Sequence, residues 1–383
     1  MKPLYNNIKI SIIKLLVRFL NALGTKKKHP RVKSERFLII TTTGIGDTLW
    51  GTPAIKALKE TYPECQIGVL TNPSGLELLK HNPNIDEIFI FKRGFNGILS
   101  LPSLLKTLRH KKFETAFIFH ASDRIIWLLA FFTGTSRIIG ESGKSKGLDF
   151  ILSDSVVLPE HLHGVEARLS LIKEVHSSTK QKTIEMFLTE GDREWVKQLL
   201  KNKHIAKGSF VIGLHPGAQK PYKCWPTENF ISLGNALTER YKCSILITGD
   251  QDEKELADML SSRIKNSINL AGDLNIRQTA ALIEKFNIFI TNDTGPMHIA
   301  FALTTPTVAL FSPTNPDVCG PYNAKGTTKV ISKPIICNPC IGKRCVEPKC
   351  MEQITVEEVL YEAENLISNL NKEKHDNSIK LQA

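Results

Sequence analysis

The order of apolar and polar residues along the chain predicts alternating strands and helices from about residue 36 onward. Short apolar runs predict strands at 37–42, 66–71, 86–91 and 115–119. Amphipathic stretches predict helices at 53–62, 101–109 and 125–132. The pattern loses clarity between 141 and 185, apart from a helix near 167–175. Such an alternation predicts a parallel sheet that is covered by helices on both faces.

The same alternation restarts after about residue 206. Apolar runs predict strands at 209–214, 243–248, 268–270, 287–291 and 307–311. Amphipathic stretches predict helices at 227–240, from 252, at 276–285 and from 296. Thr227 is a candidate N-cap for the first of these helices. A capping-box pattern, Thr355 with Glu358, opens a last helix to about 370, and we expect the polar tail 371–383 to be frayed.

Two successive sets of strands and helices predict two doubly wound, Rossmann-like α/β domains that face each other across a cleft. A chain of 383 residues is long enough for both domains to bury their own cores. We place them at 36–190 and 191–370, with an interdomain region at about 176–206. Ligands of such sheets bind beyond the carboxyl ends of the strands, so the loops at those ends are the candidate sites.

The net charge of +12 is concentrated at the start of the chain. Residues 1–36 carry ten Lys or Arg and one acid, which gives +9, so the rest of the chain is nearly balanced. This distribution, with no basic face interleaved with aromatic residues, argues against a nucleic-acid binder.

Residues 1–35 form a basic arm with helical periodicity, in which a wide apolar face is bordered by cations. This pattern is typical of a helix that lies in the interface of an anionic membrane, and we expect such a contact through residues 1–33. The alternatives are a helix packed on the first domain and a signal peptide. Lys14 and Arg18 argue against the signal peptide because they interrupt the apolar stretch. No apolar run reaches the length of roughly 18 residues that a membrane span needs.

The first candidate loop follows the first predicted strand and contains Gly44, Gly46, Asp47 and Thr48. Two glycines allow the backbone to turn sharply and approach a ligand. Asp47 is either a helix cap or, in a glycine turn that faces a cleft, a general base for a hydroxyl nucleophile. A dinucleotide fingerprint needs a third glycine and a later acid that are not in place, which disfavours an NAD-dependent oxidoreductase.

Three further loops end strands of the second domain. The loop at 215–226 contains His215, Lys220 and Lys223, and two lysines beside a glycine suit a diphosphate, although either could be a solvated surface lysine. The loop at 248–253 ends in Glu253, a carboxylate that could bond a ribose hydroxyl. The third loop opens a helix with Asp293, Thr294, Gly295 and, one turn on, His298, a pattern that suits both a cap and an anion site.

Taken in order, three motifs resemble glycosyltransferase family 9, the heptosyltransferases of lipopolysaccharide core assembly. They are Gly44-Ile45-Gly46-Asp47 with Pro53, Lys223-x-Trp225-Pro226, and Asn292-Asp293-Thr294-Gly295-x-x-His298. The likeness covers about residues 36–366. It implies a GT-B fold, an ADP-heptose-type donor, inversion at the anomeric carbon and no required metal or other cofactor.

The resemblance also implies roles for single residues. Asp47 matches the family's catalytic base, and Lys223 matches its phosphate-contacting lysine. The donor-binding loop is matched by Asp293, Thr294, Gly295 and His298. Glu253 matches a ribose-contacting acid less closely, because that loop varies in the family.

These inferences predict an inverting glycosyltransferase that moves a sugar from a nucleotide diphosphate donor to a lipopolysaccharide core or related lipid-linked glycan. The alternative is a non-catalytic nucleotide- or sugar-binding protein on the same scaffold. We expect the protein in the cytoplasm of a Gram-negative bacterium, peripheral on the inner face of its inner membrane, with no nucleic-acid partner.

Four cysteines, Cys337, Cys340, Cys345 and Cys350, are close enough in sequence to suggest structural zinc, which four thiolates would bind. The spacing of the second pair is wider than in zinc ribbons or knuckles. Reduced thiols and a disulfide formed after purification are the alternatives. The cluster is remote in sequence from Asp47, which argues against a catalytic role.

Overall fold

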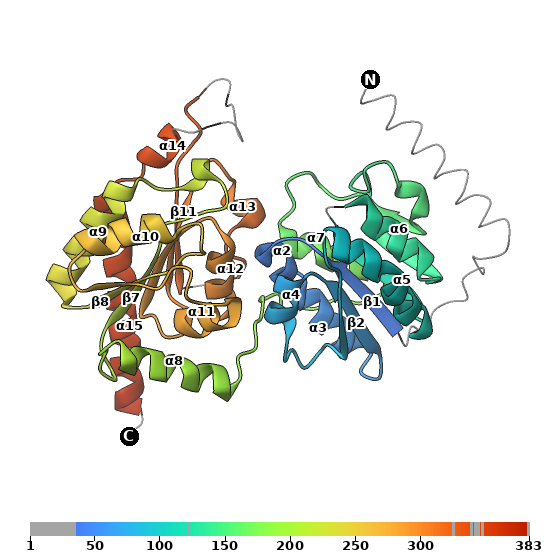
Figure 1. Ribbon diagram of the computed structural model, residues 1–383, viewed down its shortest axis with the longest axis horizontal. Helices are drawn as coiled ribbons and strands as arrows, with labels where there is room; N and C mark the ends of the chain where they lie inside the picture. The colour runs from blue at the N-terminus through green and yellow to red at the C-terminus, as the bar shows by residue number, and fades with distance from the viewer. Residues whose placement is uncertain are drawn as a thin grey trace. The chain divides into compact units, whose positions relative to one another are not determined.

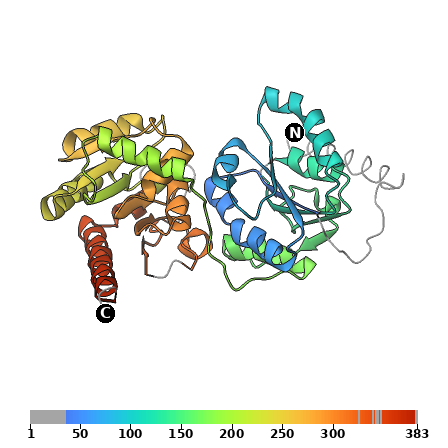
Figure 2. The ribbon, with the colours of Figure 1, turned by 90° about the horizontal axis from the view of Figure 1, so that it is seen from below.

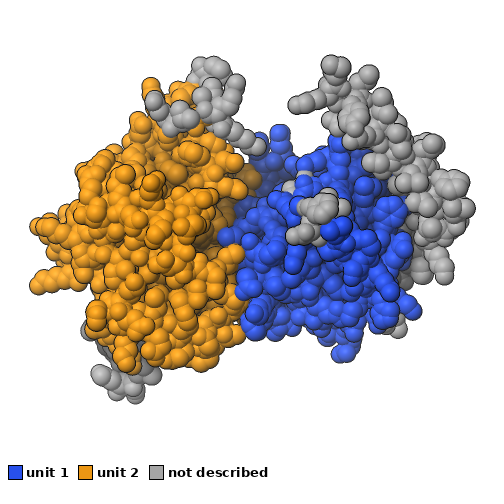
Figure 3. Space-filling model, viewed as in Figure 1, with its two compact units in different colours: residues 1–184 blue, residues 185–383 orange. Residues whose placement is uncertain are grey.

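The computed structural model describes residues 36–380 apart from 122, 324–325, 338–339, 341–344 and 346–347. The basic arm at 1–35, with its expected membrane contact, lies outside these residues. The chain divides between Ile184 and Glu185 into two compact units, coloured separately in Figure 3. This division falls inside the predicted interdomain region, a few residues before the boundary expected between 190 and 191. No helix among the described residues is long and apolar enough to cross a membrane.

The first unit is built on six strands whose neighbouring pairs are all parallel, in the order β3-β2-β1-β4-β5-β6. The strands are β1 (Arg36–Thr41), β2 (Gln66–Thr71), β3 (Glu87–Ile90), β4 (Thr115–His120), β5 (Arg137–Glu141) and β6 (Asp154–Val156). The α-helices are α2 (Ile45–Leu49), α3 (Thr52–Thr61), α4 (Pro73–Leu79), α5 (Phe95–His110), α6 (Arg124–Phe132) and α7 (Gly164–Ile172). The central strands are nearly continuous apolar runs, as sheets buried on both faces require.

Alternate residues of a strand point to opposite faces of the sheet. Because the central strands are apolar on both faces, helices must cover both. Leu38, Ile40 and Ile118 belong to one core cluster with residues of α5 and α6. Helix α7 packs against β4, β5 and α3 (Figure 1). The arrangement brings the loops after β1 and β4 to one edge, since these two strands are neighbours.

The second unit repeats the same topology, with parallel strands in the order β12-β11-β10-β7-β8-β9. The strands are β7 (Val211–His215), β8 (Ser244–Ile247), β9 (Ser267–Asn269), β10 (Ile288–Asn292), β11 (Thr307–Phe311) and β12 (Thr328–Ser332). The longer helices are α8 (Glu190–Asn202), α9 (Thr227–Tyr241), α10 (Lys254–Arg263), α11 (Ile276–Ile283), α12 (Gly295–Ala302) and α15 (Val356–Lys380), which Figure 2 shows as a long red helix. Shorter segments are η4 (Pro221–Lys223), α13 (Pro316–Cys319) and α14 (Lys349–Glu352).

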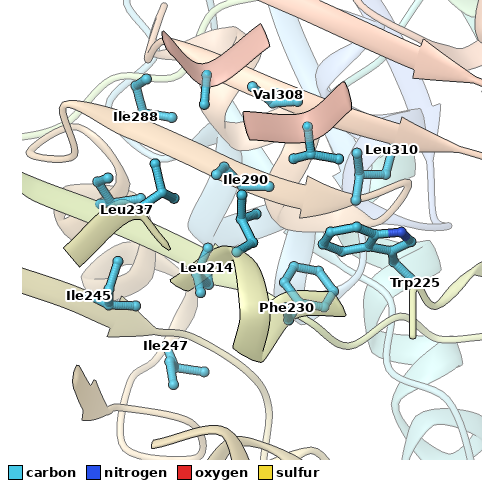
Figure 4. Close-up of a cluster of buried hydrophobic side chains, with 14 of the residues drawn as sticks. Leu214, Trp225, Phe230, Leu237, Ile245, Ile247, Ile288, Ile290, Val308 and Leu310 are labelled. Atoms are coloured by element: carbon cyan, nitrogen blue, oxygen red, sulfur yellow. The ribbon is translucent and has the colours of Figure 1, made fainter. Parts of the chain in front are cut away.

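Aromatic and aliphatic side chains between the sheet and helices α9, α10 and α15 form the core of this unit (Figure 4). Trp225 lies edge-on to Phe230 with ring centroids 4.9 Å apart. The indole of Trp225 also donates a hydrogen bond of 2.8 Å to the carbonyl of Ile354. This buried anchor fixes the end of the loop that carries Lys223.

The predicted strands are confirmed, with ends shifted by at most two residues. Several finer predictions are wrong. Thr227 is the first residue of α9 and Pro226 occupies the cap position. Helix α5 begins at Phe95, before the predicted start at 101, and contains Pro102 in its interior. The capping box of Thr355 and Glu358 is present, but α15 continues to Lys380, where we expected a frayed tail.

Candidate functional site

In each unit, the order of the strands reverses beside the first strand of the sheet, and the loops at that point are the usual ligand site of doubly wound folds. In the first unit these loops follow β1 and β4. The first supplies Thr43 and leads into α2, which carries Asp47, and the second begins at His120, the last residue of β4.

Asp47 lies in the first turn of α2 and accepts contacts from three side chains, which together with it we call the Asp47 network: Thr43, His120 and Arg168. The Thr43 hydroxyl donates to Asp47 Oδ2 at 3.0 Å. Arg168 Nη2 donates to Oδ1 at 3.0 Å. His120 Nδ1 lies 3.4 Å from Oδ2 and 2.8 Å from Thr43 Oγ1. The sequence predicted none of these partners for Asp47.

Arg168 comes from α7 and is buried, with 7% of its side chain exposed. Its guanidinium lies 5.4 Å from the centre of the Trp50 ring and also donates to the carbonyl of Gly164. Burial lowers the pKa of the guanidinium, while Asp47 acts in the opposite direction. A buried cation held in this way fixes the position of Asp47, because leaving it unpaired would be costly.

His120 is the most exposed member of the network, with 46% of its side chain accessible against 25% for Asp47. Partial burial lowers its pKa below the ordinary value, although the charge of Asp47 raises it. The imidazole is therefore mainly neutral at pH 7.

The glycines of this loop serve a different purpose from the one predicted. Gly44 has φ −75° and ψ 173°, which any residue can adopt, so the turn does not require glycine there. A Cβ on Gly44 would lie 3.8 Å from Asp47 Oδ2, so glycine leaves the carboxylate open on that side. Gly46 and Thr48 are buried within α2, and the Thr48 hydroxyl bonds the carbonyl of Gly44. Thr48 therefore supports the helix.

In the second unit, the loops after β7 and β10 lie at the corresponding point of the sheet. Lys223 Nζ donates to Asp293 Oδ2 at 2.5 Å, and the Thr314 hydroxyl donates to the same oxygen at 2.5 Å. Asn292 Nδ2 donates to the carbonyl of Pro216 at 2.7 Å, which ties the two loops together. The structure thus brings the predicted lysine and aspartate into direct contact.

The helix α12 begins at Gly295, directly after this ion pair. Thr294 occupies the N-cap position with an extended backbone and makes no side-chain capping bond. Backbone N–H groups at a helix start, next to a lysine, favour a bound anion such as phosphate. His298 is buried on the same helix, edge-on to Phe301, which makes it part of the packing of α12.

His215 and Glu253 form a second pair beside the lysine loop. His215 Nε2 lies 3.8 Å from Glu253 Oε2, and its Nδ1 lies 3.1 Å from the Thr248 hydroxyl. Burial lowers the pKa of His215 to about 4 and raises the pKa of Glu253. A Cβ on Gly217 would lie 1.9 Å from Glu253 Oε1, so only glycine lets this carboxylate lie against the loop. Lys220 is exposed.

The four clustered cysteines differ in burial: Cys337 and Cys340 are exposed, Cys345 is partly exposed and Cys350 is buried. Among the residues that the structure describes, no group of three or more His, Cys, Asp or Glu side chains is arranged to hold a metal ion. The structure gives the zinc hypothesis no support.

Comparison with known proteins adds evidence from outside the chain. The sequence profile of glycosyltransferase family 9 (heptosyltransferase) matches residues 102–351, a segment that includes Lys223 and Asp293 and begins after Asp47. Lipopolysaccharide heptosyltransferase 3 of Escherichia coli is 27% identical over 286 residues, which cover 70% of this chain and 81% of that protein.

Two solved structures have the same fold. The glycosyltransferase family 9 protein from Veillonella parvula superimposes with a TM-score of 0.78 at 21% identity, covering 89% of this chain and all of that one (100%). The ADP-heptose lipopolysaccharide heptosyltransferase II of E. coli gives a TM-score of 0.72 at 22% identity, with 88% of this chain and 99% of that chain covered. The fold is thus the predicted GT-B fold. The chain belongs to glycosyltransferase family 9, the heptosyltransferase family, and is a glycosyltransferase.

Proposed function

We propose that this glycosyltransferase moves a heptose from ADP-heptose to the core of lipopolysaccharide, with inversion at the anomeric carbon. The donor and acceptor are those named for its relatives, the lipopolysaccharide heptosyltransferase 3 and the ADP-heptose lipopolysaccharide heptosyltransferase II of E. coli. The observation that carries the proposal is the Lys223–Asp293 ion pair at the start of α12, which suits a sugar diphosphate.

In the proposed reaction, the first unit binds the acceptor and the second binds the donor. The Asp47 network removes the proton from the acceptor hydroxyl as that oxygen attacks the anomeric carbon. The bond from this carbon to the diphosphate breaks in the same step, and its electron pair leaves with the diphosphate. Lys223 and the amides at the start of α12, from Thr294 and Gly295 onward, stabilise the growing negative charge.

The remaining predicted residues are assigned by their positions. Glu253 lies at the end of the β8 loop, where acids in such folds bond a ribose, and Gly217 gives it room to reach the β7 loop. His215 holds this loop through Thr248 and stays neutral at pH 7. Lys220 is an exposed second cation for the diphosphate. His298 is a buried residue of α12 and contributes to the packing of that helix.

The proposal is tested first by ligand stabilisation. The melting temperature of the purified protein is measured with ADP, UDP, GDP and NAD at equal concentration, since a ligand stabilises the folded state by mass action. We expect ADP to raise the melting temperature and the other three to leave it unchanged. Stabilisation by UDP, GDP or NAD without ADP would contradict the assigned donor.

Acceptor specificity needs a direct assay. ADP-heptose is incubated with the protein and with lipopolysaccharides truncated at successive core positions, and heptose addition is followed by mass spectrometry. We expect one truncation to gain a single heptose. Transfer to none of them, with turnover on an unrelated acceptor, would refute the proposed substrate.

We also propose that the protein works at the inner face of the inner membrane of a Gram-negative bacterium, where its basic arm contacts anionic lipids. The support is the charge and periodicity of residues 1–33 and the lipid-linked nature of the proposed acceptor.

A further inference from the structure

One ring nitrogen of His120 is open to a ligand beside Asp47. The Thr43 hydroxyl has one proton and donates it to Asp47 Oδ2 at 3.0 Å. The contact of 2.8 Å between Thr43 Oγ1 and His120 Nδ1 then places the ring proton on Nδ1, so Nε2 of the neutral ring keeps its lone pair. Among the groups that the structure describes, none hydrogen-bonds Nε2. With 46% of the side chain accessible, His120 can accept a hydrogen bond from a ligand.

Asp47 keeps accepting capacity next to this ring. A carboxylate has about four lone-pair sites. Oδ1 uses one of them for Arg168, and Oδ2 uses one for Thr43. Gly44 leaves the Oδ2 side open, because even a Cβ there would lie 3.8 Å from this oxygen. Oδ2 can therefore still take the proton of the attacking hydroxyl, as the proposed base role of Asp47 requires.

The two open acceptor atoms belong to groups that lie side by side, since His120 Nδ1 is 3.4 Å from Asp47 Oδ2. A ligand that binds both atoms must bring two hydrogen-bond donors close together. Hydroxyls on adjacent carbons of a sugar are such a pair, because each of them can donate. An ionised phosphate or carboxylate does not fit, because it offers no donor and would be repelled by the charge of Asp47.

On the basis of the proposed transferase reaction, we propose that His120 is a specificity-determining residue that binds the hydroxyl adjacent to the attacking one on the acceptor sugar. The neighbouring hydroxyl donates to His120 Nε2, while the attacking hydroxyl gives its proton to Asp47. The acceptor is thus a sugar with hydroxyls on adjacent carbons at the point of transfer. Because Thr43 holds the ring through Nδ1, the second hydrogen bond fixes which hydroxyl faces the carboxylate.

Synthetic acceptor fragments test this assignment. The parent fragment reproduces the core truncation that gains a heptose, and each deoxy fragment lacks one hydroxyl adjacent to the attacked one. The kcat/KM for each fragment is measured at saturating ADP-heptose. For the wild type, we expect one deoxy fragment to lose about 2- to 10-fold in kcat/KM, which is the usual effect of one neutral hydrogen bond.

Two variants of His120 separate the roles of its ring nitrogens. The amide of His120→Asn can donate to Thr43 from near the position of Nδ1 but places no acceptor at Nε2. Its kcat/KM on the parent fragment should fall by about 2- to 10-fold. It should not fall further on the deoxy fragment, because both changes remove the same hydrogen bond. The longer side chain of His120→Gln brings its amide near the position of Nε2 and should again distinguish the two fragments.

The matched control is His110→Asn, which changes an exposed histidine at the end of α5 and should discriminate between the fragments as the wild type does. Circular dichroism confirms that each variant is folded. Losses that multiply when His120→Asn meets each deoxy fragment would overturn the proposal, because the residue and the hydroxyl would then act independently. Equal wild-type kcat/KM on the parent and all deoxy fragments would overturn it as well. Wild-type protein that transfers heptose to none of the core truncations would instead refute the proposed function, on which this inference rests.

Discussion

Lys223 and Asp293 form the ion pair on which the proposed donor site depends. The aspartate is buried and bonded by both Lys223 and Thr314, so it holds the ammonium group at the start of α12. The ammonium group has three N–H donors and Asp293 accepts from it through one oxygen, so N–H groups remain that can bind a diphosphate.

We predict that Lys223→Ala weakens ADP binding by about 10- to 100-fold, because a charge-assisted hydrogen bond is lost and Asp293 is left without its cation. Turnover should fall together with affinity, since the same group stabilises the leaving diphosphate. Isothermal titration and steady-state kinetics measure the two effects. Lys207→Ala, at an exposed lysine before β7, is the control. A loss confined to acceptor affinity would count against the assignment.

The sequence predicted the residues of this site but few of their contacts. Asp47 and Asp293 lie where a strand gives way to a helix, and Lys223 lies in the loop between β7 and α9, all three in recognisable motifs. Arg168 was missed because its contact joins positions 121 residues apart, and nothing in the pattern of α7 marks it. His120 could have been found, since it ends the strand that neighbours β1, where ligands bind in such folds.

Strands were easier to predict than short helices. Apolar runs such as 307–311 are buried and match their strands, because a parallel sheet buries both faces. The five-residue α2 and the three-residue edge strand β6 were missed, since so short a segment carries little periodicity. Strands β5 and β12 and helix α4 were not predicted either. Helix α8 was also missed, although Thr189 and Asp192 form a capping box before it.

Glycines inside strands show how tightly the helices cover the sheets. A Cβ on Gly213 in β7 would lie 2.1 Å from the ring of Phe286, which is stacked on Phe289. Since this buried ring cannot move freely, β7 can approach Phe286 this closely only at a glycine.

We therefore predict that Gly213→Ala lowers the free energy of unfolding by about 1–3 kcal/mol through overpacking. Urea denaturation followed by circular dichroism measures the change. Gly191→Ala is the matched control, because a Cβ there would meet only Thr189 Oγ1 at 3.6 Å, and it should be close to neutral. Equal stability of wild type and Gly213→Ala would show that the core is looser than described.

The chain as a whole repeats one topology twice, and each copy places its candidate site at the reversal of strand order. The same geometry serves different chemistry in the two units. The first unit holds a carboxylate with a neutral imidazole, and the second holds a lysine with a helix start. A reaction that removes a proton and releases a diphosphate needs both.

The basic arm at residues 1–35 bears on where in the cell the enzyme works. We predict that deletion of residues 1–30 moves the protein from the membrane fraction to the soluble fraction of cell lysates, since the cations that attract anionic lipid are removed. Turnover on a water-soluble acceptor fragment should not change. An unchanged distribution between the membrane and soluble fractions would show that the arm does not bind the membrane.

The claim that the Asp47 network drives deprotonation of the acceptor is tested most directly by Asp47→Asn. The rate of heptose transfer at saturating substrates is measured beside the affinity for ADP. We predict unchanged affinity and a rate lower by about 100- to 10,000-fold, because the amide keeps the size of the carboxylate but not its charge. Turnover close to that of the wild type would contradict the account.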